Sequence, residues 1–209
     1  MIIITAGKFG NAIGARVNEL ITVHTIDIQY IEEDFAAQFK RDFADEQHIV
    51  FASWRPYPEI CEAIDNYCYA ENKSWTMVEL HGQRLTCGPT VIPGKGACYS
   101  CYKKRYLSHH RAPERELVLT NAYQKNPALG PEGYCMPMVE LAATAIVDSL
   151  TRLTDHVGKV RVVDVLGGTV IEGEVIGIHA CKKCGEKRTT PSHERFTEKL
   201  IPELAEVLE

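Results

Sequence analysis

The chain has 209 residues, of which 45% are hydrophobic, and a formal net charge of −5. This length suits one domain or a domain with appendages, and the apolar content is enough to bury an ordinary core. A protein that binds nucleic acid through an extended basic surface is not indicated, because the net charge is negative and the basic residues form no long stripe. No segment has the length of a membrane span and no signal peptide is recognisable, so we expect a cytoplasmic protein that binds neither nucleic acid nor membrane.

The N-terminal sequence predicts a strand, a glycine turn and a helix. A β-branched apolar run at 2–4 is followed by Gly7, Gly10 and Gly14, and the helical pattern ends near Leu20. This spacing is a loosened form of the G-x-G-x-x-G loop, whose backbone amides hold phosphate at a helix N-terminus. The alternative is a tight turn with close helix-on-sheet packing and no ligand, and the looseness of the match favours it.

Strands and helices then alternate along the chain. The predicted elements are a strand at 21–26, a helix at 32–43, a strand at 48–52, a helix at 56–70 and a strand at 75–80. Such alternation is typical of a parallel sheet with crossover helices. We therefore predict an α/β fold in which residues 1–96 form a Rossmann-like unit.

Two Cys-x-x-Cys pairs are the most informative motifs. Cys98 and Cys101 follow GPTVIPGKGA, and Cys181 and Cys184 lie in CKKCGEKR. Four thiolates in two such turns match a closed structural zinc site, which leaves no position for water or substrate. A redox dithiol is the alternative for a single pair, but the turn-like, basic surroundings favour the metal, since the cations would offset the charge of a Zn(Cys)₄ centre.

The other four cysteines are not expected to form disulfides in a reducing compartment. Cys61, Cys68 and Cys87 lie in apolar segments and are predicted to be buried thiols. Cys135 lies in GYCMPM at the end of a loop, where an exposed reactive thiol is the alternative to a buried one, although no base is near it in sequence.

Residues 97–192 are predicted to form a region of cysteine turns, helix and β-hairpin within the same compact domain. The segment 109–134 is rich in Pro, Gly and Asn and is expected to be irregular, with the His109–His110 pair in a solvated loop. A mostly apolar helix follows at 137–153, in the core or at a dimer contact. A hairpin around Gly167–Gly168 then leads to the second cysteine pair, and residues 193–209 are predicted to form an amphipathic docking helix.

This combination resembles a known family. The Rossmann-like unit, the GP-x-V-x-PG-x-x-x-C-x-x-C segment from Gly88 to Cys101, the hairpin and the H-x-C-x-x-C-G segment from His179 to Gly185 are similar to the ThiF-like, ubiquitin-activating superfamily. The closer resemblance is to its bacteriocin-cyclodehydratase branch. Proteins of that branch accompany a YcaO-type heterocyclase, which converts Cys, Ser and Thr of a ribosomal precursor peptide into thiazolines and oxazolines that mature to azoles.

The resemblance implies roles for particular positions. In adenylating members a glycine loop holds the ATP phosphates and an acidic residue after the second strand binds the ribose, which here points to Gly7, Gly10, Gly14 and Asp27 as the remnant of a nucleotide site. Those members also carry an Asp after the third strand that handles Mg²⁺, whereas this chain has 53–55, Ser-Trp-Arg. Because losing that carboxylate removes most of the catalysis, we expect no adenylation and no ATP cofactor.

The resemblance therefore implies a homodimeric, non-adenylating scaffold that binds a YcaO-type heterocyclase and its precursor peptide. Longer members begin with a winged-helix-like module that captures the leader peptide, whereas here the first strand starts at Ile2. We expect leader recognition to come from a separate protein, from another site on this chain or from the partner enzyme. The alternatives are an ATP-dependent adenylyltransferase acting on a peptide or protein C-terminus and a stand-alone zinc-ribbon adaptor.

Overall fold

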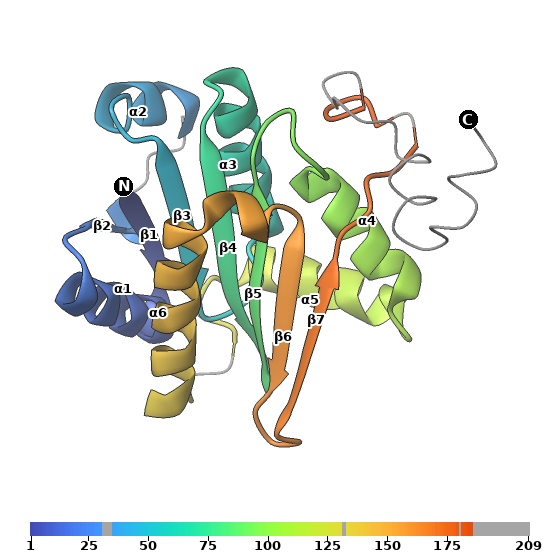
Figure 1. The fold of residues 1–209 in the computed structure, drawn as a ribbon. Helices are drawn as coiled ribbons and strands as arrows, with labels where there is room; N and C mark the ends of the chain where they lie inside the picture. Colours follow the sequence, from blue (N-terminus) through green and yellow to red (C-terminus); the bar gives the residue numbers. More distant parts are fainter. Residues whose placement is uncertain (31–34, 131–132, 180, 186–209) are drawn as a thin grey trace, which may run out of the picture.

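A seven-stranded mixed sheet forms the centre of the molecule (Figure 1). The computed structural model describes residues 1–30, 35–130, 133–179 and 181–185, so the helix predicted at 193–209 lies outside them. The spatial order of the strands is β2-β1-β3-β4-β5-β6-β7. Their bounds are β1 Ile2–Ala6, β2 His24–Asp27, β3 His48–Ser53, β4 Ser74–His81, β5 Arg84–Val91, β6 Lys159–Asp164 and β7 Thr169–Glu174.

The first four strands are parallel and the last three are antiparallel to their neighbours. Every residue of β1 and β3 is buried, as expected for parallel strands that helices cover on both faces. β6 and β7 form the predicted hairpin, in which Val163 pairs with Val170. The α/β class, the parallel sheet with crossover helices and the C-terminal hairpin are thereby confirmed.

Six helices are found in the described segments. Their bounds are α1 Gly7–Leu20, α2 Phe35–Asp42, α3 Pro58–Ala70, α4 Tyr99–His109, α5 Pro113–Lys125 and α6 Met136–Thr151, with 3-10 turns at Ile28–Tyr30 and Leu153–His156. Within those segments, no helix combines the length and the apolar character needed to cross a bilayer.

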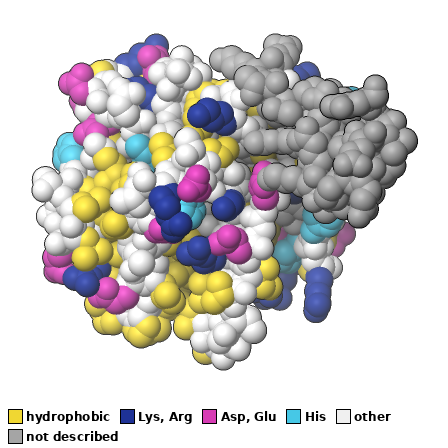
Figure 2. Space-filling model, viewed as in Figure 1, with side chains coloured by type: hydrophobic (Ala, Val, Ile, Leu, Met, Phe, Trp, Pro, Cys, Tyr) yellow, Lys and Arg dark blue, Asp and Glu magenta, His cyan; other side chains and the backbone are white. Residues whose placement is uncertain are grey.

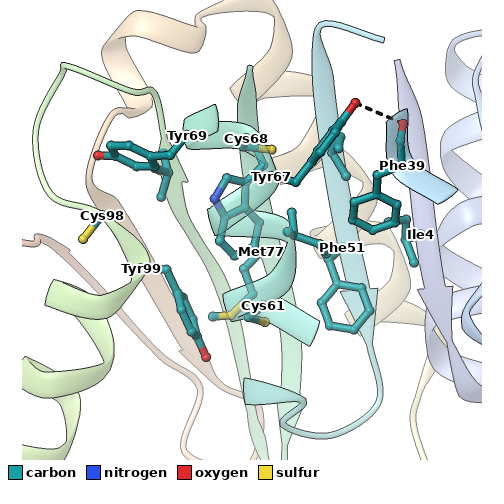
Figure 3. Close-up of a cluster of buried hydrophobic side chains, with 14 of the residues drawn as sticks. Ile4, Phe39, Phe51, Cys61, Tyr67, Cys68, Tyr69, Met77, Cys98 and Tyr99 are labelled. Carbon is teal, nitrogen blue, oxygen red and sulfur yellow. Dashed lines mark hydrogen bonds between the residues drawn. The ribbon is translucent and has the colours of Figure 1, made fainter. Parts of the chain in front are cut away.

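Two apolar layers enclose the sheet. On one face α1 and α6 pack against alternate strand residues such as Ile3, Val50 and Val78. On the other face α2, α3 and α4 cover Phe51 and Trp75, and Figure 3 shows how aromatic side chains and thiols interleave in this second layer. The predicted burial of three thiols is confirmed, because Cys61, Cys68 and Cys87 are buried, and Cys135 is exposed.

The prediction of an irregular segment at 109–134 was wrong. Residues Pro113–Lys125 form the 13-residue helix α5, with Pro113 in its first positions and Glu114 and Glu116 in its first turn. These are ordinary helix-start signals, since proline lacks the N–H that is unpaired there and acidic residues complement the helix dipole. The helix buries only Tyr123, so its sequence carries little of the apolar periodicity from which helices are predicted.

Strand β5 was also missed. Its sequence from Arg84 to Val91 contains a Gly and a Pro, which usually argue against a strand. It pairs with β4 across a two-residue turn at 82–83, and Gly82 adopts a positive φ of 61° there. This turn thus connects two strands, and β5 joins the parallel half of the sheet to the C-terminal hairpin.

Glu79 is an acidic side chain within β4, beside Ser53 of β3 in the parallel register. Burial, followed by repulsion from the carboxylate of Glu116, raises the pKa of Glu79 from 4.5 to about 8. Glu116 also lies 3.7 Å from Nε2 of His81, two residues further along β4. Glu79 is therefore mostly protonated at neutral pH.

Replacing Glu79 by Gln should make the protein relatively more stable at alkaline pH. A raised pKa in the folded state adds stability below the unfolded value of 4.5, and this contribution is lost as pH rises through about 8. Glu79→Gln has no such loss, so its free energy of unfolding relative to wild type should increase by about 2 kcal/mol between pH 5 and pH 8.5. This is less than the free energy that corresponds to the whole pKa shift, because the side chain is only partly buried. Urea unfolding at both pH values measures this, and Glu19→Gln, on the exposed side of α1, is the control. Parallel pH profiles for wild type and Glu79→Gln would contradict the assignment.

Candidate metal centre and the cavity at the sheet edge

Four cysteine sulfurs from two distant segments meet at one point. The Sγ atoms of Cys98, Cys101, Cys181 and Cys184 all lie within 4.8 Å of one another. The Sγ–Sγ distances are 3.8 Å for Cys98–Cys101, 3.7 Å for Cys98–Cys181 and 3.5 Å for Cys101–Cys184. A tetrahedron with metal–sulfur bonds of about 2.3 Å has edges of about 3.8 Å, so the cluster could hold a four-coordinate metal ion.

Local backbone geometry positions the sulfurs. Cys98 is the N-cap residue of α4, and the N–H of Cys101 in its first turn donates to the Cys98 carbonyl at 3.0 Å. In the second pair, the N–H of Gly185 donates to the carbonyl of Cys181 at 2.7 Å, and any side chain at Gly185 would clash with that carbonyl. The N–H of Ile178 donates to Sγ of Cys101 at 3.3 Å, which orients this sulfur and stabilises its negative charge.

The electrostatics of the cluster favour a cation. Hydrogen bonding with Cys101 raises the pKa of Cys98 and lowers the pKa of Cys184, so the sulfurs share protons unevenly. Four thiolates at this spacing, three of them from buried residues, would repel one another strongly. A divalent cation would displace these protons and compensate the charge of the thiolates.

A buried carboxylate connects the two cysteine pairs to the rest of the fold. Asp65 of α3 is fully buried and accepts hydrogen bonds from Nε1 of Trp75 at 3.0 Å and from the N–H of Tyr99 at 3.4 Å. Nζ of Lys183, which lies between the cysteines of the second pair, donates to the other carboxylate oxygen at 2.6 Å. Asp65 thus holds α3, β4, the start of α4 and the second cysteine turn together.

The basic residues beside the cysteines do not all serve the cluster. Lys183 is neutralised by Asp65, and Nζ of Lys103 forms an ion pair with Glu62 at 2.8 Å. Lys104 and Lys182 are exposed, and no ion pair joins either of them to another described residue. Of these four lysines, Lys103 and Lys183 thus form ion pairs with carboxylates, and Lys104 and Lys182 form a positively charged surface near the cluster.

The glycines near the N-terminus serve close packing. Gly7 has a φ of 70°, and a side chain on it would collide with the indole of Trp54. A Cβ atom on Gly10 would collide with the carbonyl of Ala52 in β3, and one on Gly14 would lie 2.9 Å from Cγ2 of Thr5 in β1. The contacts of Gly10 and Gly14 are close packing of the helix on the sheet, and they explain why no larger residue fits at these two positions.

A cavity of about 550 Å³ opens at the carboxyl ends of the parallel strands, and both Gly7 and Asp27 line it. Asp27 ends β2, and its carboxylate accepts hydrogen bonds from Nδ2 of Asn11 at 2.7 Å and from the N–H of Gln29 at 3.0 Å. Gly10 and Gly14 face the sheet instead. The structure therefore brings two of the four positions of the predicted nucleotide site to one cavity.

Arg55 lies in the wall of this cavity, two residues after β3, and is only 4% exposed. Its guanidinium lies 4.1 Å from the ring centroid of Tyr57 and 4.7 Å from that of Tyr123. Two long hydrogen bonds, of 3.3 and 3.4 Å, reach the carbonyls of Pro56 and Pro127, and Nε has no hydrogen-bond partner. A buried cation thus lies at the strand end where the family resemblance implies a metal-binding carboxylate that this chain lacks.

Two residues of these sites were missed in the sequence. Asp65 lies among the buried residues of α3, between Ile64 and Cys68, and a single carboxylate on an apolar helix face was the signal that could have identified it. Tyr123 of α5 was missed because the helix that carries it was not predicted. Arg55 was noted only for the absence of a carboxylate, and its burial depends on residues far away in sequence.

Comparisons with solved structures show a similar fold in heterocyclases and in MccB of E. coli. The chain is similar to the heterocyclase TruD, with a TM-score of 0.61 and 15% identity over 88% of this chain and 27% of that one. A heterocyclase in complex with substrate and cofactor gives a TM-score of 0.60 with 16% identity, over 88% and 25% of the two chains. MccB of E. coli with ATP gives 0.57 with 15% identity, over 88% and 66%. No protein-family model matches the chain, and no curated protein matches it.

These similarities confirm the fold that the resemblance implied. The chain spans about a quarter of the length of the heterocyclases and about two thirds of MccB. At identities of 15 to 16%, these similarities show a shared fold, and the activity has to be inferred from the residues of this chain.

Replacing Cys98 or Cys184 by Ser should remove bound metal and destabilise the half of the fold that the cluster closes. We expect a loss of at least about 3 kcal/mol, which lowers Tm by roughly 6 to 12 °C for a chain of this size, because metal-binding free energy at such a site is folding free energy. Metal content by mass spectrometry and thermal unfolding measure both effects. Cys135→Ser, which changes an exposed thiol, is the matched control. An unchanged Tm in Cys98→Ser and after chelation would contradict a structural metal.

Proposed function

We propose that this chain is a non-adenylating scaffold subunit of a cyclodehydratase complex, which installs thiazoline and oxazoline rings in a ribosomal precursor peptide during the biosynthesis of thiazole/oxazole-modified bacteriocins. Similarity of fold to two heterocyclase structures over 88% of the chain supports the general assignment. A fold of this kind hosts several chemistries, so the site must decide between a catalytic and a scaffolding role.

The packing of Trp54 and Arg55 is the observation that carries the scaffolding role. The indole of Trp54 lies against Gly7, where a phosphate-binding loop needs open space in front of its backbone amides. The guanidinium of Arg55 occupies the following position, buried between aromatic rings. Adenylyl transfer depends on Mg²⁺ placed against developing charge, and a buried cation at this strand end opposes a second cation there.

The cysteine cluster is proposed to bind Zn²⁺ in a structural role. Four cysteine ligands at tetrahedral spacing fill the coordination sphere, which is the usual arrangement of a structural zinc site and leaves no open position for catalysis. Cys98 and Cys101 would hold the ion from α4, and Cys181 and Cys184 from the turn after the hairpin. The ion would supply charge compensation and a cross-link between these segments.

We propose that a YcaO-type heterocyclase docks on the surface around this cluster, where Lys104 and Lys182 are exposed, together with the segment 193–209. The precursor peptide is proposed to bind within the same complex. A homodimer contact is proposed at α6, because its outer side exposes Met136 by 59% and Leu141 by 48% although its inner side is core. Figure 2 shows apolar side chains gathered over this helix, whereas charges of both signs lie close together beside them.

An ATP-dependent adenylyltransferase acting on a peptide or protein C-terminus is the second candidate. The cavity that Gly7 and Asp27 line favours it, as does similarity of fold to MccB with ATP. The position of Trp54 opposes it, because its indole lies so close to Gly7 that a Cβ atom there would collide with it, which narrows the approach to the glycine turn.

Calorimetric titration with Mg-ATP and a pyrophosphate-exchange assay on the same metal-loaded sample separate the two candidates. We expect no exchange and no binding tighter than about 1 mM, which corresponds to about −4 kcal/mol. Trp54→Gly with Arg55→Asp in one variant would reopen the space and restore a carboxylate, and it serves as the comparison. Exchange by the wild-type protein would establish an adenylating enzyme and refute the scaffold proposal.

Reversing the exposed charges beside the cluster should weaken complex formation with a YcaO-type heterocyclase from the same genome. Lys104→Glu with Lys182→Glu should raise Kd at least about tenfold, because rim charges contribute mainly to association and specificity. Surface plasmon resonance at two salt concentrations measures the change. Lys40→Glu on α2, a change of the same charge at an exposed position, is the control. Equal Kd values for all three proteins would show that this surface is not the docking site.

A further inference from the structure

Arg55 is a charged side chain whose hydrogen-bonding capacity is only partly met. The residue is 4% exposed, Nε has no partner, and its two hydrogen bonds to carbonyl oxygens are long, at 3.3 and 3.4 Å. No carboxylate in the described part of the chain lies within ion-pairing distance of it. Ser53, two residues earlier, is fully buried, and its hydroxyl likewise lacks a hydrogen-bond partner.

Burial of such a cation requires compensation. Stacking on Tyr57 and Tyr123 provides part of it, since aromatic faces attract a guanidinium. A buried charged group with an unpaired donor loses at least as much free energy as such stacking provides, because the cost of removing that donor from water is not recovered. An oxyanion would match the remaining need, because a guanidinium binds two oxygens of one carboxylate or phosphate at once.

The cavity next to Arg55 restricts which anion fits. Its walls are mainly apolar and include Trp54, Tyr57, Ile60 and Tyr123. Two carboxylates, Asp27 and Glu59, also line it, so negative charges outnumber the single arginine. A polyphosphate would be repelled by these carboxylates, whereas a ligand with one negative charge and an apolar body would pair with Arg55 and fill the apolar walls.

We propose that this cavity binds a small apolar monocarboxylate, with the ligand carboxylate on the guanidinium of Arg55 and the apolar body against the aromatic walls. A volume of about 550 Å³ accommodates a ligand of the size of a substituted aromatic acid. This site is independent of the proposed scaffold role.

Calorimetric titration of the full-length, metal-loaded protein with benzoate, benzamide and inorganic phosphate tests the site. We expect benzoate to bind at least tenfold more tightly than benzamide, which has the same shape without the charge, and more tightly than phosphate. Arg55→Gln should weaken benzoate binding at least tenfold, whereas Arg84→Gln, the same change of charge at a remote and 58% exposed position, should leave it unchanged. Arg55→Lys keeps the charge without the fork and should give an intermediate Kd.

Glu59→Gln provides a test that does not depend on removing the buried arginine. Removal of one cavity carboxylate should tighten benzoate binding and narrow the difference between benzoate and phosphate. The proposal would be overturned by equal binding of benzoate and benzamide or by unchanged benzoate binding in Arg55→Gln. It would also be overturned if no binding were detected at about 10 mM benzoate, a concentration that would nearly saturate a site with a Kd of about 1 mM. Tighter binding of phosphate than of benzoate would overturn the carboxylate assignment. Arg55→Gln should still associate with the heterocyclase, so failure of this site and failure of the scaffold role are distinguishable.

Discussion

Convergence of four cysteine sulfurs is the constraint on which the C-terminal half of this fold depends. Cys98 and Cys101 begin α4 directly after β5, whereas Cys181 and Cys184 follow β7, so the cluster joins the two ends of the antiparallel half of the sheet. Three of these cysteines belong to the apolar layer around Trp75. A metal ion bound here would therefore act on the same residues as core packing, and it would supply a cross-link for a long chain segment that is entropically costly to close.

Asp65 extends this constraint into the parallel half. Its carboxylate receives a side-chain donor from β4, a backbone donor at the start of α4 and the ammonium of Lys183. A fully buried carboxylate is stable only when its oxygens are satisfied, so each of these donors fixes the position of the others. The cysteine cluster and the Rossmann-like unit are for this reason parts of one packed structure.

The sequence allowed prediction of the features that depend on local pattern. Continuous apolar runs identified β1 and β3, alternation identified the hairpin, and the Cys-x-x-Cys spacing indicated the four residues that the fold brings together. Features that depend on tertiary contacts were missed. α5 buries one residue, β5 carries its Gly and Pro at an irregularity in its pairing with β4 and beyond its pairing with β6, and the burial of Arg55 is created by aromatic rings on α5 and after β3. The spacing of the glycines indicated packing and not a ligand, because a close approach of helix and strand requires glycine whether or not a ligand binds.

The carboxyl edge of the parallel strands, where α/β folds usually bind their ligands, has an unusual charge arrangement in this chain. A buried guanidinium stands at the end of β3, and the raised pKa of Glu79 keeps the neighbouring carboxyl group on β4 mostly protonated at neutral pH. A magnesium site needs ionised carboxylates close together, whereas the ends of β3 and β4 offer a cation and a neutral acid, and the carboxylates of Asp27 and Glu59 lie elsewhere in the cavity wall. A ligand with one negative charge would suit this arrangement, because its anionic group could accept hydrogen bonds from Arg55 without any metal. On the assignments proposed above, this edge binds an anion and does not transfer a nucleotide, and ring formation in the complex would be carried out by the partner enzyme.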